Sequence, residues 1–439
     1  MSEAPILIEA KDCFPFENQE GNGEAIQYFI SNQNELNIFH IGNQNKNDDL
    51  EIAYFSTKDA KWYAGRLVGE AQFKYNGIDY KIVVKPRFGN LQLFRMLEEV
   101  FNIKLTHSKS NVNKQDDYQY LIKQLIAFLW LNLLSKANKH GIPKHNKVRY
   151  YKGAIVRGRL DVRKSIMPLY VEEKIVSRYN EKVVDANISK ILLKAYRILK
   201  SDYKLSSIKV SLGAKNAIEQ ILTSNTRDTY LTESDFNNIK YNDIYKSFKP
   251  VVDLSWDIIK KKSFGNNNDK NSDSFSFFID MAEVWEIYLR SILKRHFAKF
   301  GWKLREDKIQ TYKEKDFKRL LIPDIVLERE KDVMVWDAKY KRMEFDYYDY
   351  DRADFFQIHT YINYYHQNKN VIAGGLLYPL SKDFSTERQF KNKSESLFNQ
   401  EATNTRYLVD GIDYTDLTEE KVKREELNFL SRIADLQKN

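Results

Sequence analysis

Two aspartates and a lysine in the C-terminal part of the chain have the types and spacing of a metal-dependent hydrolytic site. The segment Leu321–Lys341 reads LIPDIVLEREKDVMVWDAKYK, in which two strand-like runs meet at the turn-prone Glu330–Asp332. Because side chains alternate along a strand, Asp337 and Lys339 point the same way, in line with two apolar valines. A partly desolvated carboxylate and ammonium are costly unless something neutralises them.

A divalent metal would neutralise the carboxylates. Asp337, and Asp324 from the neighbouring run, are the expected oxygen ligands of Mg²⁺, for which Mn²⁺ can substitute. Such an ion polarises a scissile phosphate and lowers the pKa of a bound water. Lys339 would position that water or stabilise the negative charge that develops on phosphorus. The pattern therefore predicts hydrolysis of a phosphodiester bond.

Two helices are expected to complete the site. Glu286 has apolar residues one and two turns away, an unusual position for a glutamate, and we predict it to be a third carboxylate and metal ligand. Glu283 is the competing candidate, and an ordinary helix-face role for Glu286 is the alternative. Gln357 lies one turn before Tyr361 and could orient water or contact the DNA backbone.

The chain is long enough for several domains, and its patterns predict three. Residues 1–105 are β-rich, with strand-like runs that include Gln27–Ile30 and Tyr80–Val84. Residues 118–262 are mainly helical, with a strand-like interruption at Lys147–Leu160. Polar stretches at Thr106–Asp117 and Gly265–Ser274 mark the two boundaries.

The third segment, residues 275–439, alternates helices and strands around the candidate site. We expect a mixed sheet within an α/β domain, so that the fold class of the whole chain is α+β multidomain. The expected order is a helix from Phe278 to Phe297, strands at Lys318–Glu328 and Asp332–Lys341, a helix at Asp354–His366, a strand at Val371–Tyr378 and a terminal helix at Thr418–Leu436.

The charge balance, the cysteine count and the apolar stretches of the sequence indicate which partners and which cell compartment to expect. Lysine and arginine exceed aspartate and glutamate by 70 to 61, a formal charge of +9 that suits a polyanionic partner. The single cysteine, Cys13, excludes an internal disulfide and a cysteine-rich zinc site. No signal pattern or membrane-spanning stretch is found, and we expect a cytoplasmic protein with no membrane partner.

The motif residues resemble a known family. Pro323-Asp324 through Asp337-Ala338-Lys339 is similar to the signature of PD-(D/E)xK nucleases, and the longer pattern resembles the McrC-type subunit of modification-dependent restriction systems. Further segments of the chain resemble blocks of that family in the same order: Ile82–Leu97, Val156–Val162, Arg178–Leu192, Ile279–Glu286, Asp354–Tyr361 and Gly375–Pro379.

The resemblance implies a restriction-endonuclease-like fold for residues 275–439 and a metal-dependent DNA endonuclease that defends against phage and other foreign DNA. It also implies a McrB-like AAA+ GTPase partner, with residues 1–105 docking on it in a hetero-oligomer. The sequence has no G-x-x-x-x-G-K-[ST] phosphate loop, so nucleotide hydrolysis would belong to that partner. Double-strand cleavage would require two nuclease domains to pair.

Other interpretations stay open at this point. The chain could be a catalytically silent adaptor of an AAA+ motor, or a stand-alone nuclease of DNA repair or of a mobile element. The acidic and aromatic run Glu344–Asp354 favours a solvated loop over a metal site. Arg87, Arg157 and Arg159 could touch phosphate or an acidic motor surface, although arginines near glycine are common in turns.

Overall fold

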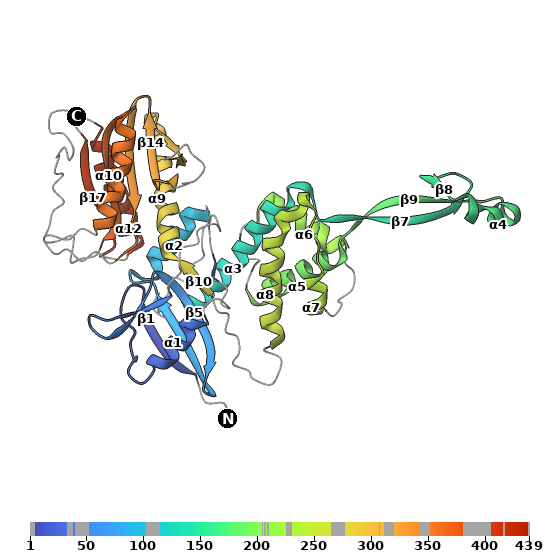
Figure 1. Cartoon of the computed structure of the whole chain (residues 1–439), viewed down its shortest axis with the longest axis horizontal. Coiled ribbons are helices and arrows are strands. Elements are labelled where there is room, and N and C mark those ends of the chain that lie inside the picture. Colours follow the sequence, from blue (N-terminus) through green and yellow to red (C-terminus); the bar gives the residue numbers. More distant parts are fainter. Residues whose placement is uncertain are drawn as a thin grey trace. The chain divides into compact units, whose positions relative to one another are not determined.

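The chain folds into two compact units (Figure 1). Unit 1 comprises residues 1–112 and 275–439, and unit 2 comprises residues 113–274. The computed structural model describes residues 5–32, 38–39, 52–101, 115–203, 205, 208, 210–224, 231–264, 277–306, 308–310, 320–341, 352–380, 405–415 and 418–437. Its mixture of helices and several sheets agrees with the expected α+β class, but the first and third predicted segments share unit 1.

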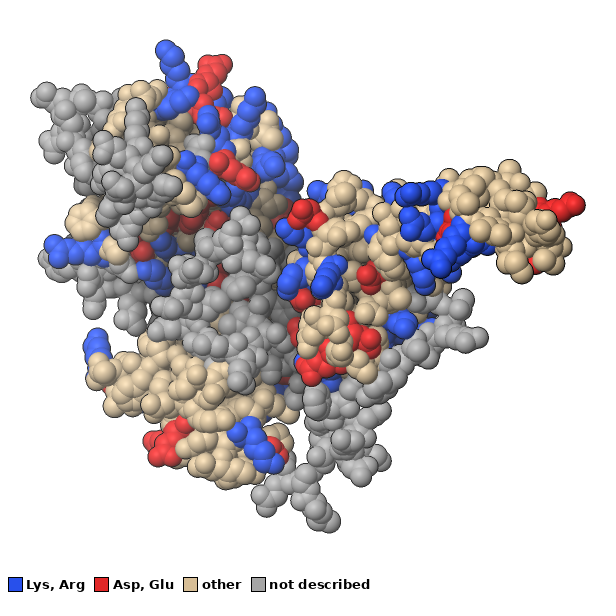
Figure 2. All heavy atoms as spheres, turned by 45° about the vertical axis from the view of Figure 1, so that its right-hand side comes forward, with Lys and Arg blue, Asp and Glu red and all other residues tan. Residues whose placement is uncertain are grey.

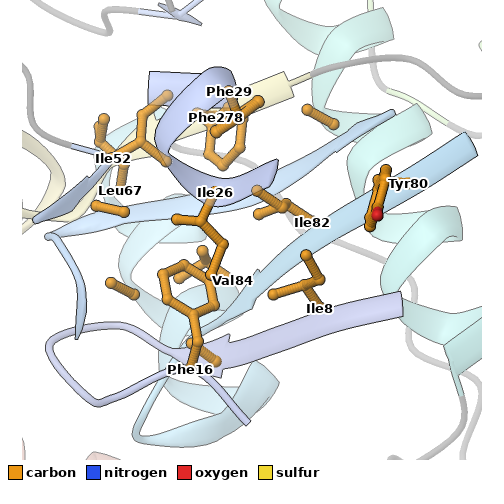
Figure 3. Packing of buried hydrophobic residues seen from close by; sticks show 14 of the residues in the cluster. Ile8, Phe16, Ile26, Phe29, Ile52, Leu67, Tyr80, Ile82, Val84 and Phe278 are labelled. Carbon is orange, nitrogen blue, oxygen red and sulfur yellow. The ribbon is translucent and has the colours of Figure 1, made fainter. Parts of the chain in front are cut away.

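A five-stranded sheet in unit 1 combines strands from the first and third segments of the chain. Its strands, in spatial order, are β1 (Ile6–Lys11), β6 (Ile78–Lys85), β5 (Leu67–Tyr75), β10 (Phe277–Asp280) and β2 (Ile38–Phe39). β10 runs antiparallel to β5, and its Phe278 packs in a core with Ile26 and Phe29 (Figure 3). The prediction that Phe278 begins a helix was therefore wrong. The helix starts at Met281, because the Asp280 carboxylate caps it by accepting hydrogen bonds from two backbone N–H groups.

The N-terminal segment contains helices that the sequence analysis missed. α1 (Gly23–Ser31) includes Gln27–Ile30, which was wrongly predicted to be a strand. Ala25, Ile26 and Phe29 are buried at helical spacing, and this packing outweighs the β-propensity of the aromatic residues. α2 (Gly89–Phe101) follows β6, where the Tyr80–Val84 strand is confirmed. A hairpin completes the segment, formed by β3 (Ala53–Ser56) and β4 (Lys61–Ala64).

A second five-stranded sheet in unit 1 carries the candidate site. Its strands, in spatial order, are β11 (Lys303–Arg305), β14 (Ile325–Arg329), β15 (Asp332–Ala338), β16 (Asn370–Leu380) and β17 (Arg406–Asp413). β14 and β15 form an antiparallel hairpin, and β15, β16 and β17 are parallel. The helices packed against this sheet are α9 (Met281–Phe297), α10 (Arg352–His366) and α12 (Glu419–Asp435). The mixed sheet and these three helices follow the predicted order, whereas β17 was not predicted.

The predicted strand at Lys318–Glu328 is two strands, β13 (Leu320–Leu321) and β14. β13 pairs with β12 (Ile309–Gln310) in a separate small sheet. Pro323 lies at the break, where it cannot donate a ladder hydrogen bond. The next strand also ends earlier than predicted, at Ala338, so that Lys339 follows the strand.

Unit 2 is a helical body with a β-arm. The helices of the body are α3 (Gln115–Ala137), α5 (Ala186–Asp202), α6 (Leu212–Ser224), α7 (Glu233–Asn237) and α8 (Lys249–Phe264). The elements of the arm are β7 (Lys144–Gly153), β8 (Arg159–Leu160), α4 (Val162–Glu172) and β9 (Ile175–Val184). The mainly helical character and the strands within Lys147–Leu160 are confirmed, whereas β9 was missed.

The structure tests the two predicted boundary stretches only at Gln115–Asp117. Residues 106–114 and the whole of Gly265–Ser274 lie outside the described residues, and Gln115–Asp117 belong to α3 rather than to a loop. Among the helices described, none is long and apolar enough to cross a lipid bilayer.

A largely buried network of charged and polar side chains links α2 of the first segment to α9 and α12 of the third segment. Glu426 of α12 accepts hydrogen bonds from Arg95 of α2 at 2.7–3.0 Å and from the Tyr288 hydroxyl of α9 at 2.7 Å. Glu99 of α2 accepts a hydrogen bond from Ser291 of α9 at 2.8 Å. Since α2 comes from the first segment and α9 and α12 from the third, these contacts help to make unit 1 one body.

We expect Glu426→Ala to destabilise unit 1 by about 3–5 kcal/mol, because it leaves the half-buried Arg95 guanidinium without its main partner. Urea unfolding of the full chain measures the loss. Glu420→Ala, which removes an exposed carboxylate from the same helix, is the matched control and should leave the unfolding midpoint unchanged. Equal midpoints for the two variants would contradict the role given to Glu426.

Candidate active site

The β14–β15 hairpin brings the two predicted aspartates together. Its register pairs Arg329 with Asp332 and Ile325 with Trp336, so the next positions along it, Asp324 and Asp337, lie opposite each other. The Glu330 backbone takes a left-handed conformation in the two-residue turn, with φ of 55°. The Asp324 carboxylate also accepts a hydrogen bond from the Ala338 N–H at 2.8 Å. A local hairpin therefore sets the relation between the two carboxylates.

Lys339 lies beside this pair, as the strand alternation predicted. Its Nζ is 2.6 Å from an oxygen of Asp337, whose side chain is almost fully buried. Val333 and Val335, on the same side of β15, pack in a core with residues of α10. The carboxylate and ammonium thus lie at the edge of an apolar core, where water screens their charges poorly.

Helix α10 holds Lys339 from a second direction. The Gln357 carbonyl oxygen accepts a hydrogen bond from Lys339 Nζ at 2.9 Å, and the Gln357 amide donates to the Tyr361 hydroxyl at 3.0 Å. Asp354, one turn earlier, lies 3.3 Å from Lys339 Nζ and 2.7 Å from Lys341 Nζ. Gln357 therefore joins the site through Lys339.

Helix α9 borders the site on the Asp324 side. Arg290 donates a hydrogen bond to the backbone carbonyl of Asp324 at 2.6 Å. Glu286, one turn before Arg290, lies 3.9 Å from its guanidinium and is close enough to act on the charge of Asp324. Glu286 is thus near the aspartate pair, and its role as a third metal ligand stays a prediction.

The site favours protonation of its aspartates. Burial, and then the neighbouring Asp337 and Glu286 carboxylates, raise the pKa of Asp324 well above its ordinary value. Burial also raises the pKa of Asp337, against the opposing effect of the Lys339 ammonium. For Lys339, burial lowers the pKa, but the carboxylates of Asp337 and Asp354 outweigh it and the net pKa is raised. Lys339 is therefore protonated at neutral pH.

These residues fit a divalent cation. Both carboxylate oxygens of Asp337 are buried and accept no well-directed hydrogen bond from the described residues, although the Lys339 ammonium lies close. Two facing carboxylates are the hard oxygen donors that Mg²⁺ and Mn²⁺ prefer. As the side chains stand, the described part of the chain brings no three histidine, cysteine or acidic residues close enough to hold a metal. Water or phosphate oxygens would complete the coordination of an ion between Asp324 and Asp337.

Asp354 and Tyr361 are the site residues that the sequence analysis did not select. Asp354 ends the run Glu344–Asp354, which was expected to be a solvated loop, but it is buried in the first turn of α10. Residues 344–351 of that run lie outside the described residues. The sequence spacing could have identified both residues, because Asp354, Gln357 and Tyr361 recur at helical intervals on one face of the helix.

Comparison with known proteins identifies one matching family. Residues 63–379 match the family described as "McrBC 5-methylcytosine restriction system component". The matched range includes the hairpin, α9 and α10, and hence all five predicted site residues. No curated protein matches the chain.

Two solved assemblies from Thermococcus gammatolerans contain similar chains. One is a half-complex from a tetradecameric assembly of McrB AAA+ hexamers with bound McrC; it is 14% identical, with a TM-score of 0.47, and the alignment covers 98% of this chain and 100% of the other. The other is a McrBC complex, also 14% identical, with a TM-score of 0.31 and coverage of 69% of this chain and 90% of the other.

We expect Asp324→Asn to stabilise the metal-free protein at neutral pH. A carboxyl whose pKa is raised on folding contributes most to stability while protonated, and that contribution is lost as the pH rises through its folded-state pKa. The amide resembles the protonated form and can still accept the Ala338 hydrogen bond, so the gain should be on the order of 1 kcal/mol, the equivalent of one pKa unit.

Urea unfolding in EDTA measures this gain in the free energy of unfolding. The measurement is repeated at several pH values between pH 7 and about pH 4, where ordinary carboxyl groups titrate. The advantage of Asp324→Asn should shrink as the pH falls. Asp79→Asn, which changes an exposed aspartate of β6, is the control. A destabilised Asp324→Asn variant at neutral pH would contradict the charge arrangement that we describe.

Proposed function

This chain belongs to the McrBC 5-methylcytosine restriction system component family, and we propose that it is the metal-dependent DNA endonuclease subunit of such a system, defending the cell against phage and other foreign DNA. The observation that carries the proposal is the Asp324, Asp337 and Lys339 cluster at the end of one hairpin. Two carboxylates that could hold a cation lie beside a positive charge, a combination that favours metal-assisted phosphodiester hydrolysis.

Each residue has a separate role in this proposal. Asp324 and Asp337 hold Mg²⁺ or Mn²⁺, with Glu286 available as a further carboxylate. When bound, the cation polarises the scissile phosphate and lowers the pKa of a water molecule. Lys339 contributes an ammonium group beside the aspartates, which positions the water or stabilises negative charge developing on the phosphate. Gln357 holds the Lys339 ammonium toward the aspartates.

We expect Asp337→Asn to abolish Mg²⁺-dependent cleavage of methylated plasmid, because it removes a metal ligand. Lys339→Gln should lower the cleavage rate about 100-fold, the scale for loss of one charge-stabilising group. Asp332→Asn changes another aspartate of β15 and is the matched control, since it should leave cleavage intact. The assay contains the AAA+ protein encoded beside this chain, with GTP or ATP.

The same assay separates the other two interpretations. If neither wild type nor variants cut DNA, while the nucleotide hydrolysis of the AAA+ protein rises, the chain is an adaptor and our proposal fails. If wild type cuts without the AAA+ protein and without nucleotide, the chain is a stand-alone nuclease. Cleavage by Asp337→Asn at the wild-type rate would place the chemistry elsewhere.

A McrB-like AAA+ GTPase is the partner that we propose, in a hetero-oligomer whose nuclease domains pair for double-strand cleavage. McrC in the Thermococcus gammatolerans assembly is bound to McrB AAA+ hexamers. Docking by residues 1–105, which the family resemblance implied, stays a prediction. As a second candidate surface we propose the β-arm of unit 2. In Figure 2 the end of the arm is mostly tan, with acidic atoms at its extremity, whereas the blue of lysine and arginine gathers nearer the helical body. This end carries the exposed apolar residues Val162, Ile166, Met167, Tyr170 and Val171.

We expect Tyr170→Asp/Val171→Asp to weaken binding of the AAA+ protein about tenfold or more, because charges replace an apolar contact. The two side chains are 93% and 75% exposed, so the fold should tolerate the change. Leu212→Asp alters an equally exposed apolar residue of the helical body and is the control. If calorimetry shows that the double variant binds the AAA+ protein with wild-type affinity, the β-arm is not the docking surface and residues 1–105 remain the candidate.

A further inference from the structure

Arg87 was a candidate for contact with phosphate or with a motor protein, but the structure buries it. Only 4% of its side chain is exposed, and the Asp12 carboxylate beside it is fully buried. Arg87 Nε lies 3.7 Å from Asp12, whose carboxylate also accepts a hydrogen bond from the Arg87 backbone N–H. β1 and β6 are parallel neighbours, so the residues that follow them meet at one edge of the sheet. A buried ion pair therefore lies at that edge.

Arg87 of this ion pair contacts the residues that follow β15, the strand that carries Asp337. The Arg87 guanidinium donates a hydrogen bond to the backbone carbonyl of Lys341 at 3.0 Å and lies over the Tyr340 ring, 4.5 Å from its centroid. Tyr340 is 4% exposed. Burial, and then the Asp12 carboxylate, raise the pKa of its hydroxyl well above the ordinary value. Arg87 thus touches the two residues that follow Lys339.

The opposite side of the same short segment is held by α10. Asp354 contacts the ammonium groups of both Lys339 and Lys341, at 3.3 and 2.7 Å. The Lys339 backbone N–H donates to the Leu377 carbonyl of β16 at 2.9 Å. Residues 339–341 lie beyond the end of β15. These contacts, rather than the hydrogen bonds of a regular strand, hold them in position.

We propose that Arg87 is a positioning residue for the active site, which acts from the N-terminal sheet by fixing Tyr340 and the Lys341 carbonyl so that Lys339 faces Asp337. Its effect on cleavage rests on the proposed function, whereas its effect on the Lys339 side chain does not. Arg87 touches no reacting group. Arg87 orients the backbone segment that carries Lys339. A small misplacement of the Lys339 ammonium is enough to slow catalysis.

The test uses a double variant, Asp12→Asn/Arg87→Met, in the full chain. Removal of Arg87 alone would leave a buried unpaired carboxylate and could unfold the protein, whereas removal of both charges avoids that cost. Asp410→Asn/Arg432→Met removes another ion pair with a buried carboxylate from unit 1, at 2.8 Å between α12 and β17, and is the matched control. Circular dichroism and the unfolding midpoint show whether each variant is folded.

The first measurement is acetylation of Lys339 by a limiting amount of acetic anhydride, quantified by mass spectrometry against the exposed Lys303 of the same molecule. Lys339 is 16% exposed and ion-paired, so it should react slowly in wild type and in the control. Labelling should rise several-fold in Asp12→Asn/Arg87→Met. A folded double variant with wild-type labelling overturns the proposal, whether or not the protein cuts DNA.

The second measurement is cleavage kinetics with the AAA+ protein present. A misplaced Lys339 should lower kcat about tenfold or more with little change in KM for DNA, because its charge acts on the transition state. The double variant combined with Lys339→Gln should be no slower than Lys339→Gln alone. Additive losses would contradict an effect through Lys339, while absence of cleavage by wild type would count against the proposed function only.

Discussion

The burial of two facing aspartates is the physical constraint on which the candidate site of unit 1 depends. Asp324 and Asp337 face each other at the end of the β14–β15 hairpin, and burial raises the pKa of both carboxyls, so nearby positive charge favours their ionised forms. Lys339 supplies part of that charge, and Gln357 and Asp354 hold its ammonium. A divalent cation would supply the rest. The cost of burying these two carboxylates is the physical basis of the metal site that we propose.

Much of the surrounding architecture keeps these groups in place. α9 is capped by Asp280 at the end of a strand of the N-terminal sheet, so that sheet fixes where the helix of Glu286 and Arg290 begins. The Glu426 network ties α2 to α9 and α12, and the Asp12–Arg87 pair reaches residues 340–341. The first and third segments therefore build one body, in which the N-terminal sheet contacts the elements that surround the β14–β15 hairpin.

The sequence was informative where the geometry is local. Strand alternation predicted that Lys339 would face Asp337, and a two-residue turn is enough to set Asp324 opposite Asp337. Arg87 was misjudged, because its partners Asp12 and Lys341 are 75 and 254 residues away and no local pattern relates them. α1 was missed for a similar reason, since packing of Ile26 and Phe29 on the sheet overrides local β-propensity.

Binding of Mn²⁺ to the purified chain, followed by electron paramagnetic resonance without DNA or partner protein, tests the central claim most directly. Wild type should remove free Mn²⁺ from the spectrum, and Asp337→Asn should not, whereas Asp79→Asn should behave as wild type. Mg²⁺ should displace the bound Mn²⁺, because both prefer the same oxygen ligands. Equal Mn²⁺ binding by wild type and a folded Asp337→Asn variant would contradict a metal site at the aspartate pair.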